Sequence, residues 1–466
     1  MKIKLTPYKF YDALSFGSKT GAVNNSVYFI GIGGIGMSAI ARYYRNLGYN
    51  VSGYDKTQTE LTDKLQAEGI KVHFVDNVNL ADKNAGLIVF TPAVPGDHKE
   101  FNFFKSNDYN LKKRSEVLGI LIKELFSICI AGTHGKTTTS SMVAHILRDS
   151  GYGCNAFLGG VASNYETNFW SDKNNVAVAE ADEYDRSFLQ LNPDIAIITS
   201  MDPDHLDIYG TEMNMQDAFI NFSKNIKPGG VLICRNNLLR IDEFFKNKIT
   251  YSLNDKTADC FAQNVSIDKG SYYFDFSVNG EVIKGFSLHM GGSHNVENAV
   301  AAITAAFQLG IDKEKIKSAI ASFKGVKRRF EYVIKTDDLV FIDDYAHHPG
   351  ELSALISGVR EMFSSKKLTV VFQPHLFSRT KDLAKGFASA LDLADQIILL
   401  PVYPARELPI ENVSSNLIAS FMKKDVVIVE KEDLAETIKK IKPEVLITAG
   451  AGDIDKLVKP LKNILS

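Results

Sequence analysis

Cysteine is scarce in this chain of 466 residues: there are four in all, and no two form a C-x-x-C pair. Without such a pair, neither a zinc knuckle nor a redox dithiol can be inferred from cysteine spacing. Reduced cysteines are typical of cytoplasmic proteins, and we expect this location here. The four residues are Cys129, Cys154, Cys234 and Cys260.

The chain also lacks an excess of charge and a long apolar run. Its 53 basic and 55 acidic side chains leave a net charge of −2, which argues against a nucleic-acid or anionic-membrane partner. The longest apolar stretches, such as 192–201 and 396–402, are too short to cross a bilayer. Residues 1–10 contain lysines without an apolar segment behind them, so we expect no signal peptide and no membrane insertion.

The length and the pattern of apolar residues indicate an α/β protein of several domains. A chain of 466 residues is too long for one ordinary core. Short apolar runs alternate with amphipathic stretches, which predicts mostly parallel sheets covered by helices. Shorter alternating segments between 250 and 288 predict a small antiparallel sheet. Composition changes place domains at 1–115, 116–324 and 325–466.

The first strand runs into a glycine-rich loop, Gly31-Ile-Gly-Gly-Ile-Gly-Met37, that opens a helix. Glycines at this spacing let backbone N–H groups approach a diphosphate at the helix N-terminus. Asp55 ends the next strand, where an acid could accept from a ribose hydroxyl. Close packing of strand on helix would explain the glycines alone, but strand, helix and acid together favour a nucleotide. NAD is the usual occupant of such a loop.

A second loop, Ala131-Gly-Thr-His-Gly-Lys-Thr-Thr138, also joins a strand to a helix. A lysine beside glycines at a helix start binds β- and γ-phosphates, and the next hydroxyl reaches Mg²⁺. Ile130 stands where the first glycine of the standard phosphate loop would be, so this loop is shorter. We predict that ATP binds here. Two phosphate loops argue against a simple dehydrogenase.

Two acidic runs, 180–186 and 202–207, follow strands of the same domain. In a parallel sheet these strand ends share an edge with the second loop, where oxygen ligands suit Mg²⁺. A solvated acidic loop is the ordinary alternative for one such run, but two at this edge favour a metal. We expect Glu180 and His205 to be ligands, and Asp182 and Asp204 to support them.

The last domain carries basic and histidine-rich segments. Residues 325–331 contain three basic side chains that could form a solvated linker, or reach ATP phosphates when domains close. Residues 343–349 and 372–380 follow two strands and contain His348 and Arg379, which would suit a carboxylate-bearing amino acid. Paired histidines could suggest zinc, but no third ligand has suitable spacing.

Together these segments resemble the Mur ligase family of peptidoglycan synthesis, and most of all the branch that adds L-alanine. The resemblance implies an N-terminal Rossmann-like UDP-sugar domain, a central ATPase and a C-terminal Rossmann-like domain that closes over ATP. It implies that Mg²⁺ and ATP serve to join L-alanine to UDP-N-acetylmuramate through an acyl phosphate and a tetrahedral intermediate, and that the first loop holds the UDP diphosphate. The matching segments are 31–37, 131–139, 180–185, 204–207, 327–331, 344–349 and 450–453.

The resemblance also implies roles for individual residues. Lys136, His205, Glu180, Arg329 and His348 are expected to be catalytic, with Thr137, Glu180 and His205 serving Mg²⁺. The ATP site would comprise Gly132, Thr133, His134, Gly135, Lys136, Thr137, Thr138, His294, Asn298, Arg328, Arg329 and Asp344. The UDP-sugar and alanine sites would comprise Gly33, Gly34, Ile35, Gly36, Met37, Asp55, Thr91, Tyr345, His348, Arg379 and Arg406.

Three departures from the family pattern concern this chain. Some members carry a carbamylated lysine after the metal histidine, whereas residues 219–222 contain no lysine. Leu376 stands where the alanine-adding branch usually has arginine, and Arg406 stands where glycine is common. We hypothesise that Arg406 supplies the missing guanidinium to the alanine carboxylate, so that Arg406→Ala would raise the KM for alanine.

Three other functions remain as alternatives at this stage. A recycling ligase would join UDP-N-acetylmuramate to a tripeptide; its first loop resembles Gly-Thr-Phe-Met-Gly, unlike residues 34–38 here. An NAD-dependent oxidoreductase would use Gly31 to Gly36 for NAD. A non-catalytic nucleotide-binding regulator would release no phosphate. We expect a monomer or a homodimer.

Overall fold

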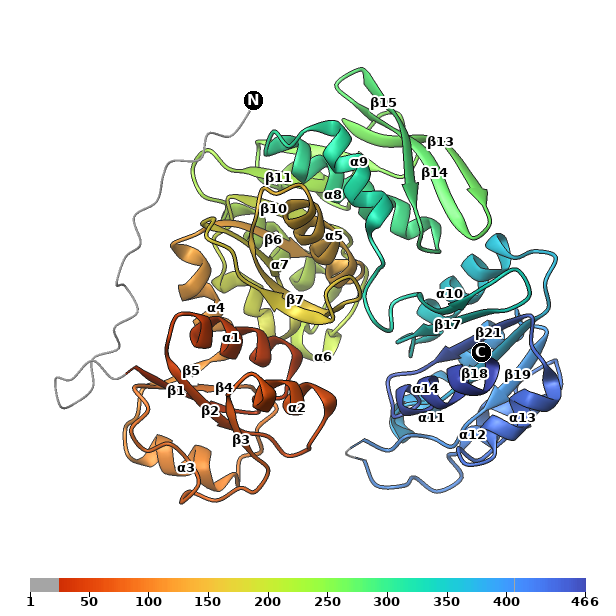
Figure 1. Cartoon of the computed structure of the whole chain (residues 1–466), viewed down its shortest axis with the longest axis horizontal. Helices are drawn as coiled ribbons and strands as arrows, with labels where there is room; N and C mark the ends of the chain where they lie inside the picture. Colours follow the sequence, from red (N-terminus) through yellow and green to blue (C-terminus); the bar gives the residue numbers. More distant parts are fainter. Residues whose placement is uncertain (1–24, 406) are drawn as a thin grey trace. The chain divides into compact units, whose positions relative to one another are not determined.

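The computed structural model describes residues 25–405 and 407–466, and it separates into two compact units (Figure 1). The first unit holds the chain up to Phe261 together with Phe276–Ile283 and Glu297–Ile320. The second unit holds Ala262–Asp275, Lys284–Val296 and Ala321–Ser466. The predicted absence of a signal peptide concerns residues 1–10, which lie outside the described part.

The first sheet has five parallel strands in the order β3-β2-β1-β4-β5. Strand β1 is buried on both faces, because Val27 and Phe29 enter one core and Tyr28 and Ile30 another. The strand order reverses between β1 and β4, and ligands of such sheets bind at this reversal. The elements are β1 (Ser26–Ile30), α1 (Ile35–Asn46), β2 (Asn50–Tyr54), α2 (Glu60–Ala67), β3 (Lys71–His73), β4 (Leu87–Phe90), α3 (Lys99–Ser106), β5 (Leu111–Lys113) and α4 (Arg114–Lys123).

The second sheet has ten strands in the order β15-β14-β13-β12-β11-β10-β6-β9-β7-β8. Strand β6 lies between β10 and β9, and its loop therefore opens at a second reversal of strand order. Strands β7 and β8 pair antiparallel. Strands β13, β14 and β15 are neighbours in the sheet, and the connections between them are too short for a parallel crossover. The strands are β6 (Phe126–Ala131), β7 (Asn155–Ala162), β8 (Thr167–Trp170), β9 (Val176–Glu180), β10 (Ile195–Ile198), β11 (Val231–Arg235), β12 (Lys248–Ser252), β13 (Cys260–Asp268), β14 (Ser271–Val278) and β15 (Glu281–Leu288).

Helices and short 3₁₀ segments connect these strands. Helix α5 follows the lysine-bearing loop directly and is buried along most of its length, which holds its first turn in place. The elements are α5 (Lys136–Asp149), η1 (Tyr184–Gln190), α6 (Leu206–Tyr209), α7 (Glu212–Lys224), η2 (Ile241–Glu243), α8 (Ser293–Gln308) and α9 (Lys313–Ser322).

The third sheet has six strands in the order β16-β17-β21-β18-β19-β20, parallel except for β16. Apolar residues of these strands pack against α13 and α14 to form a core of their own. The elements are β16 (Glu331–Lys335), β17 (Val340–Asp344), α10 (Pro349–Met362), β18 (Leu368–Phe372), α11 (Phe377–Leu391), β19 (Gln396–Leu399), α12 (Ser415–Ala419), β20 (Val426–Ile428), α13 (Leu434–Ile441), β21 (Val445–Ala449) and α14 (Asp455–Leu465).

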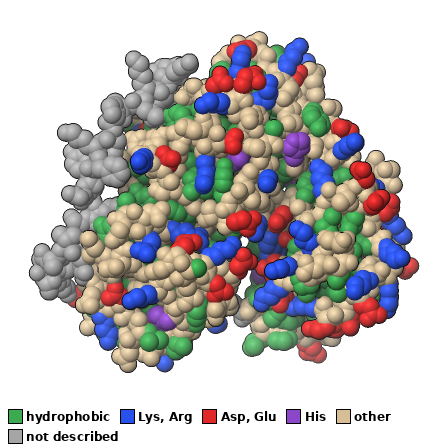
Figure 2. Space-filling view, viewed as in Figure 1, with side chains coloured by type: hydrophobic (Ala, Val, Ile, Leu, Met, Phe, Trp, Pro, Cys, Tyr) green, Lys and Arg blue, Asp and Glu red, His purple; other side chains and the backbone are tan. Residues whose placement is uncertain are grey.

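The predicted fold class is confirmed: the chain is α/β, with mostly parallel sheets and small antiparallel parts. All four cysteines are buried and unpaired. On the face drawn in Figure 2, acidic and basic side chains are interspersed, in keeping with the balanced composition. Within the described residues, no helix has both the length and the apolar character to cross a membrane.

Candidate functional site

The second glycine-rich loop leaves β6 and turns into α5 with two glycines in left-handed or related conformations. Gly132 has φ +139° and Gly135 has φ +82°, and residues other than glycine rarely adopt these backbone conformations. A β-carbon at Gly132 would lie 2.0 Å from Thr199 Oγ1, so the loop has no room for one. The turn aims the N-terminus of α5 at the carboxyl edge of the sheet, where helix N–H groups bind anions.

Lys136 is held at the start of α5 by a buried carboxylate. Its Nζ donates to the Gly132 carbonyl at 2.7 Å and lies 2.8 Å and 2.7 Å from the two oxygens of Glu183. The Glu183 side chain is 1% exposed, and Tyr209 donates its hydroxyl to the Glu183 carbonyl. A buried pair of this kind fixes the ammonium in position beside the loop, where a phosphate could also accept from it.

Glu180 and Thr137 form the next contact of the site. Thr137 Oγ1 lies 3.1 Å and 3.0 Å from the two Glu180 oxygens. Glu180 reaches this place because β7 has glycine at position 159: a β-carbon there would lie 1.9 Å from Glu180 Oε2. Two of the three predicted metal ligands are thus in direct contact.

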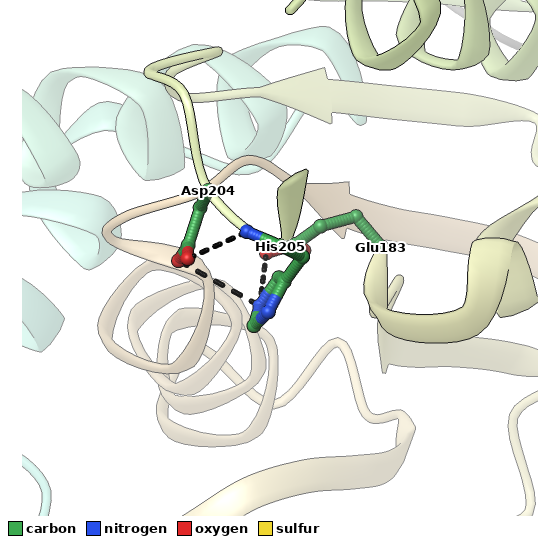
Figure 3. A group of neighbouring side chains, drawn as sticks. All are labelled: Glu183, Asp204 and His205. Carbon is green, nitrogen blue, oxygen red and sulfur yellow. Dashed lines mark hydrogen bonds and ion pairs between the residues drawn. The ribbon is translucent and has the colours of Figure 1, made fainter. Parts of the chain in front are cut away.

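His205, the third, lies with a different set of carboxylates. Its Nε2 is 3.9 Å from Glu183 Oε1 and 3.6 Å from Asp204 Oδ2, and the three side chains converge in Figure 3. His205 has φ +51°, a strained conformation that positions its ring against Tyr184. Sequence reasoning did not select Glu183, because an acidic run does not say which of its carboxylates is buried.

The remaining residues of the second loop contact α8 and the segment that follows β10. Thr133 Oγ1 lies 2.9 Å from Ser200 Oγ, which also accepts from the His134 N–H. A β-carbon at Gly135 would lie 2.7 Å from Asn298 Oδ1, so Asn298 packs directly on the loop. Thr138 is buried behind it. His294 belongs to the second unit, where its ring lies against Gly292.

In the first glycine-rich loop, Asp55 supports the backbone. Its Oδ2 accepts from the Gly33 N–H at 2.7 Å, so the acid that was predicted to face a ribose also fixes the loop. Gly31 has φ +89° and packs on Thr91, and Gly34 precedes α1 as its N-cap.

The side chains of two other residues predicted in this loop have different surroundings. Met37 is 2% exposed and belongs to the core, whereas Ile35 lines a cavity beside the helix start. That cavity also contains Arg114, which the sequence did not single out.

In the second unit, the basic segment is tied to the edge of the third sheet. Arg328 donates to the Gly450 carbonyl, and its Nε lies 3.4 Å from Asp343. The guanidinium groups of Arg328 and Arg329 lie 5.1 Å and 5.3 Å from the Tyr345 ring centre. Asp344 accepts from two backbone N–H groups, of Phe330 and Ala346, at 2.7 Å each.

Two histidines beside Arg379 complete this edge. The His375 ring stacks on Tyr403, with centres 5.7 Å apart, and lies 6.3 Å from the His347 ring. His348 caps α10 instead, since its Nδ1 accepts from the Gly350 N–H at 3.4 Å. The sequence did not single out His347, whose ring turns towards His375, because residue spacing does not reveal the orientation of a ring. Arg406, the predicted alanine ligand, lies outside the described residues.

The environment of His375 leads to a pH prediction. Burial, reinforced by the charge of Arg379, lowers the pKa of His375 to about 4. The unfolded chain binds this proton near pH 6.5, so it holds more protons than the folded chain between the two values. Stability should therefore fall as pH drops from 6.5 towards 4. His375→Gln should show a shallower fall in melting temperature over this window, whereas an unchanged slope would contradict the prediction.

This chain is similar to three known family profiles and to several known proteins. Three family profiles match in order: Mur ligase family, catalytic domain, at 26–125; Mur ligase middle domain at 130–306; and Mur ligase, glutamate ligase domain, at 328–452. The UDP-N-acetylmuramate–L-alanine ligase of Cytophaga hutchinsonii is 50% identical over 452 residues, covering 94% of this chain and 96% of its own. That of Porphyromonas gingivalis strain W83 is 49% identical and covers 94% and 98%.

Solved structures agree with these matches. The UDP-N-acetylmuramate-alanine ligase of Thermotoga maritima superposes with a TM-score of 0.82 at 28% identity, covering 94% of this chain and 98% of that one. A murein peptide ligase of Psychrobacter arcticus has a TM-score of 0.67 at 22% identity, which supports the fold alone. The resemblance stated from the motifs is confirmed.

Proposed function

The chain belongs to the Mur ligase family, and we propose that it joins L-alanine to the carboxylate of UDP-N-acetylmuramate in a reaction that consumes ATP. One observation carries the proposal from the structure itself. Lys136, at a helix start and held by a buried carboxylate, lies in the same compact unit as the first glycine-rich loop, which is of the kind that receives a diphosphate. Relatives that are half identical over nearly the whole chain supply the substrate names.

The proposed chemistry has two steps. The muramoyl carboxylate attacks the γ-phosphate of ATP, which gives an acyl phosphate and ADP. The free amine of L-alanine then attacks the acyl carbon, and the tetrahedral intermediate expels phosphate to leave an amide. Both steps build negative charge on phosphoryl or acyl oxygens, and fixed cations and helix N–H groups stabilise such charge.

Lys136 and the N-terminus of α5 are the groups we assign to that stabilisation. The oxygen and nitrogen atoms nearby suit the coordination of a hard divalent cation. They belong to Thr137 with Glu180, and to the group Glu183, Asp204 and His205. When bound, Mg²⁺ would supply positive charge against the phosphates. In this proposal Gly132 to Thr138 and Asn298 hold ATP, and His294, Arg328, Arg329 and Asp344 of the second unit are assigned to ATP as well.

We assign one substrate to each predicted domain. Residues 1–115 would take the UDP-sugar through Gly33 to Met37, Asp55 and Thr91. Residues 116–324 would take ATP. Residues 325–466 would take L-alanine through Tyr345, His348, Arg379 and Arg406, and the inward rings of His347 and His375 extend that set.

Phosphate release tests the proposal. With ATP, Mg²⁺ and UDP-N-acetylmuramate, we expect release that depends on L-alanine and is much slower with a tripeptide of the peptidoglycan stem. Faster release with the tripeptide would instead indicate a recycling ligase. Release without any UDP-sugar, or none with any acceptor, would contradict the proposal.

A further inference from the structure

A cavity in the first unit joins the first glycine-rich loop to the acidic segment after β9. Its volume is about 130 Å³, roughly ten times what one water molecule needs, so it admits a group larger than water. Gly36 at the start of α1 lines one side, and Glu180 and Asp182 line the other. Arg114, the first residue of α4, lies between them.

Arg114 is pressed against the first turn of α1. A β-carbon at Gly36 would lie 2.6 Å from Arg114 Nη1, so the last glycine of the loop makes room for the guanidinium. The other side of the guanidinium faces Asp182, with Nη2 3.2 Å from Oδ2. The arginine side chain is 27% exposed and that of Asp182 is 37% exposed. Because the pair is partly solvated, a stronger anion can share or replace the Asp182 contact.

The helix start is also fixed relative to the central sheet. The buried Asn168, on β8, donates its amide to the Ile35 carbonyl at 2.6 Å and to Ser38 Oγ at 3.1 Å. The first turn of α1 and the guanidinium are therefore held together before a ligand arrives. Preorganised donors of this kind lower the entropic cost of binding.

We propose that Arg114 binds the diphosphate of the nucleotide-sugar, together with the N-terminus of α1. This inference rests on the proposed function. Helix N–H groups and a guanidinium converge at one place, Gly36, and a guanidinium matches phosphate oxygens with two parallel donors. Through its contact with Asp182, the same arginine aligns the bound diphosphate with the segment that carries Glu180 and Glu183.

The test is equilibrium binding to the full chain of UDP-N-acetylmuramate, UDP-N-acetylglucosamine and ATP. The two UDP-sugars share the diphosphate, but only the first has the carboxylate that reacts. Arg114→Gln should weaken both by a similar factor of about 10 to 100, the effect of losing a hydrogen bond to a charged group, and leave ATP unchanged. Arg45→Gln, at the far end of the same helix, is the matched control and should bind all three like wild type.

Each other outcome overturns the assignment. A loss confined to UDP-N-acetylmuramate would make Arg114 a carboxylate ligand. No loss, or an equal loss for ATP, would leave it as a structural bridge to Asp182. If Arg114→Gln does not fold, Arg114→Lys keeps the charge without the paired donors and should weaken both UDP-sugars while sparing ATP. A wild-type chain that binds neither UDP-sugar would remove the proposed function and this inference together.

Discussion

Lys136→Met is expected to lower kcat by about 100- to 1000-fold, because a fixed cation at the transferring phosphoryl group is worth about that much. The same change should also destabilise the first unit. Glu183, whose side chain is 1% exposed, would lose the ammonium that lies 2.7 Å from Oε2. Leaving a buried charge unpaired costs about 3 to 5 kcal/mol. A drop in activity alone would therefore not separate catalysis from folding.

A double variant separates the two effects. Lys136→Met with Glu183→Gln removes both charges, so the urea midpoint should return towards that of the wild type while kcat stays low. Steady-state phosphate release and urea unfolding, measured on both variants, provide the readouts. Recovery of kcat in the double variant would show that Lys136 acts only by neutralising Glu183, and our assignment would be wrong.

Gly159→Ala should reduce kcat/KM by about 100-fold by displacing Glu180, the scale of effect that a displaced catalytic group produces. The added methyl group would lie 1.9 Å from Glu180 Oε2 and 2.6 Å from its Cδ, so the carboxylate must move off Thr137. Because Gly159 is not among the residues with positive φ, backbone strain does not contribute. Steady-state kinetics over a range of Mg²⁺ concentrations would show the loss, which we expect Glu180→Gln to share.

Gly96→Ala is the matched control for this change. Its added methyl group would have no heavy atom within 4 Å, and Gly96 also has ordinary φ. It should therefore keep wild-type kinetics. If the Gly159→Ala variant stayed within threefold of this control, the position of Glu180 against Thr137 would not matter to the reaction.

The local pattern of the sequence was sufficient for the fold class and for most strands. The apolar runs at 87–90 and 368–372 form β4 and β18, and an alanine-rich segment forms α8, Ser293–Gln308. Parallel strands buried on both faces are apolar throughout, and glycines mark the turns that follow them. These signals depend on neighbouring residues only, so the sequence by itself carries them.

Side-chain partners, by contrast, were decided by the tertiary structure. Arg114 reaches Gly36 because β5 delivers the start of α4 to the edge where β1 ends. Glu183 is buried under Lys136, while the other acidic residues of the run stay more exposed. His347 and His375 come from different strand ends. Such contacts depend on strand order and packing across long separations in the chain. Periodicity and spacing, which are local, do not encode them.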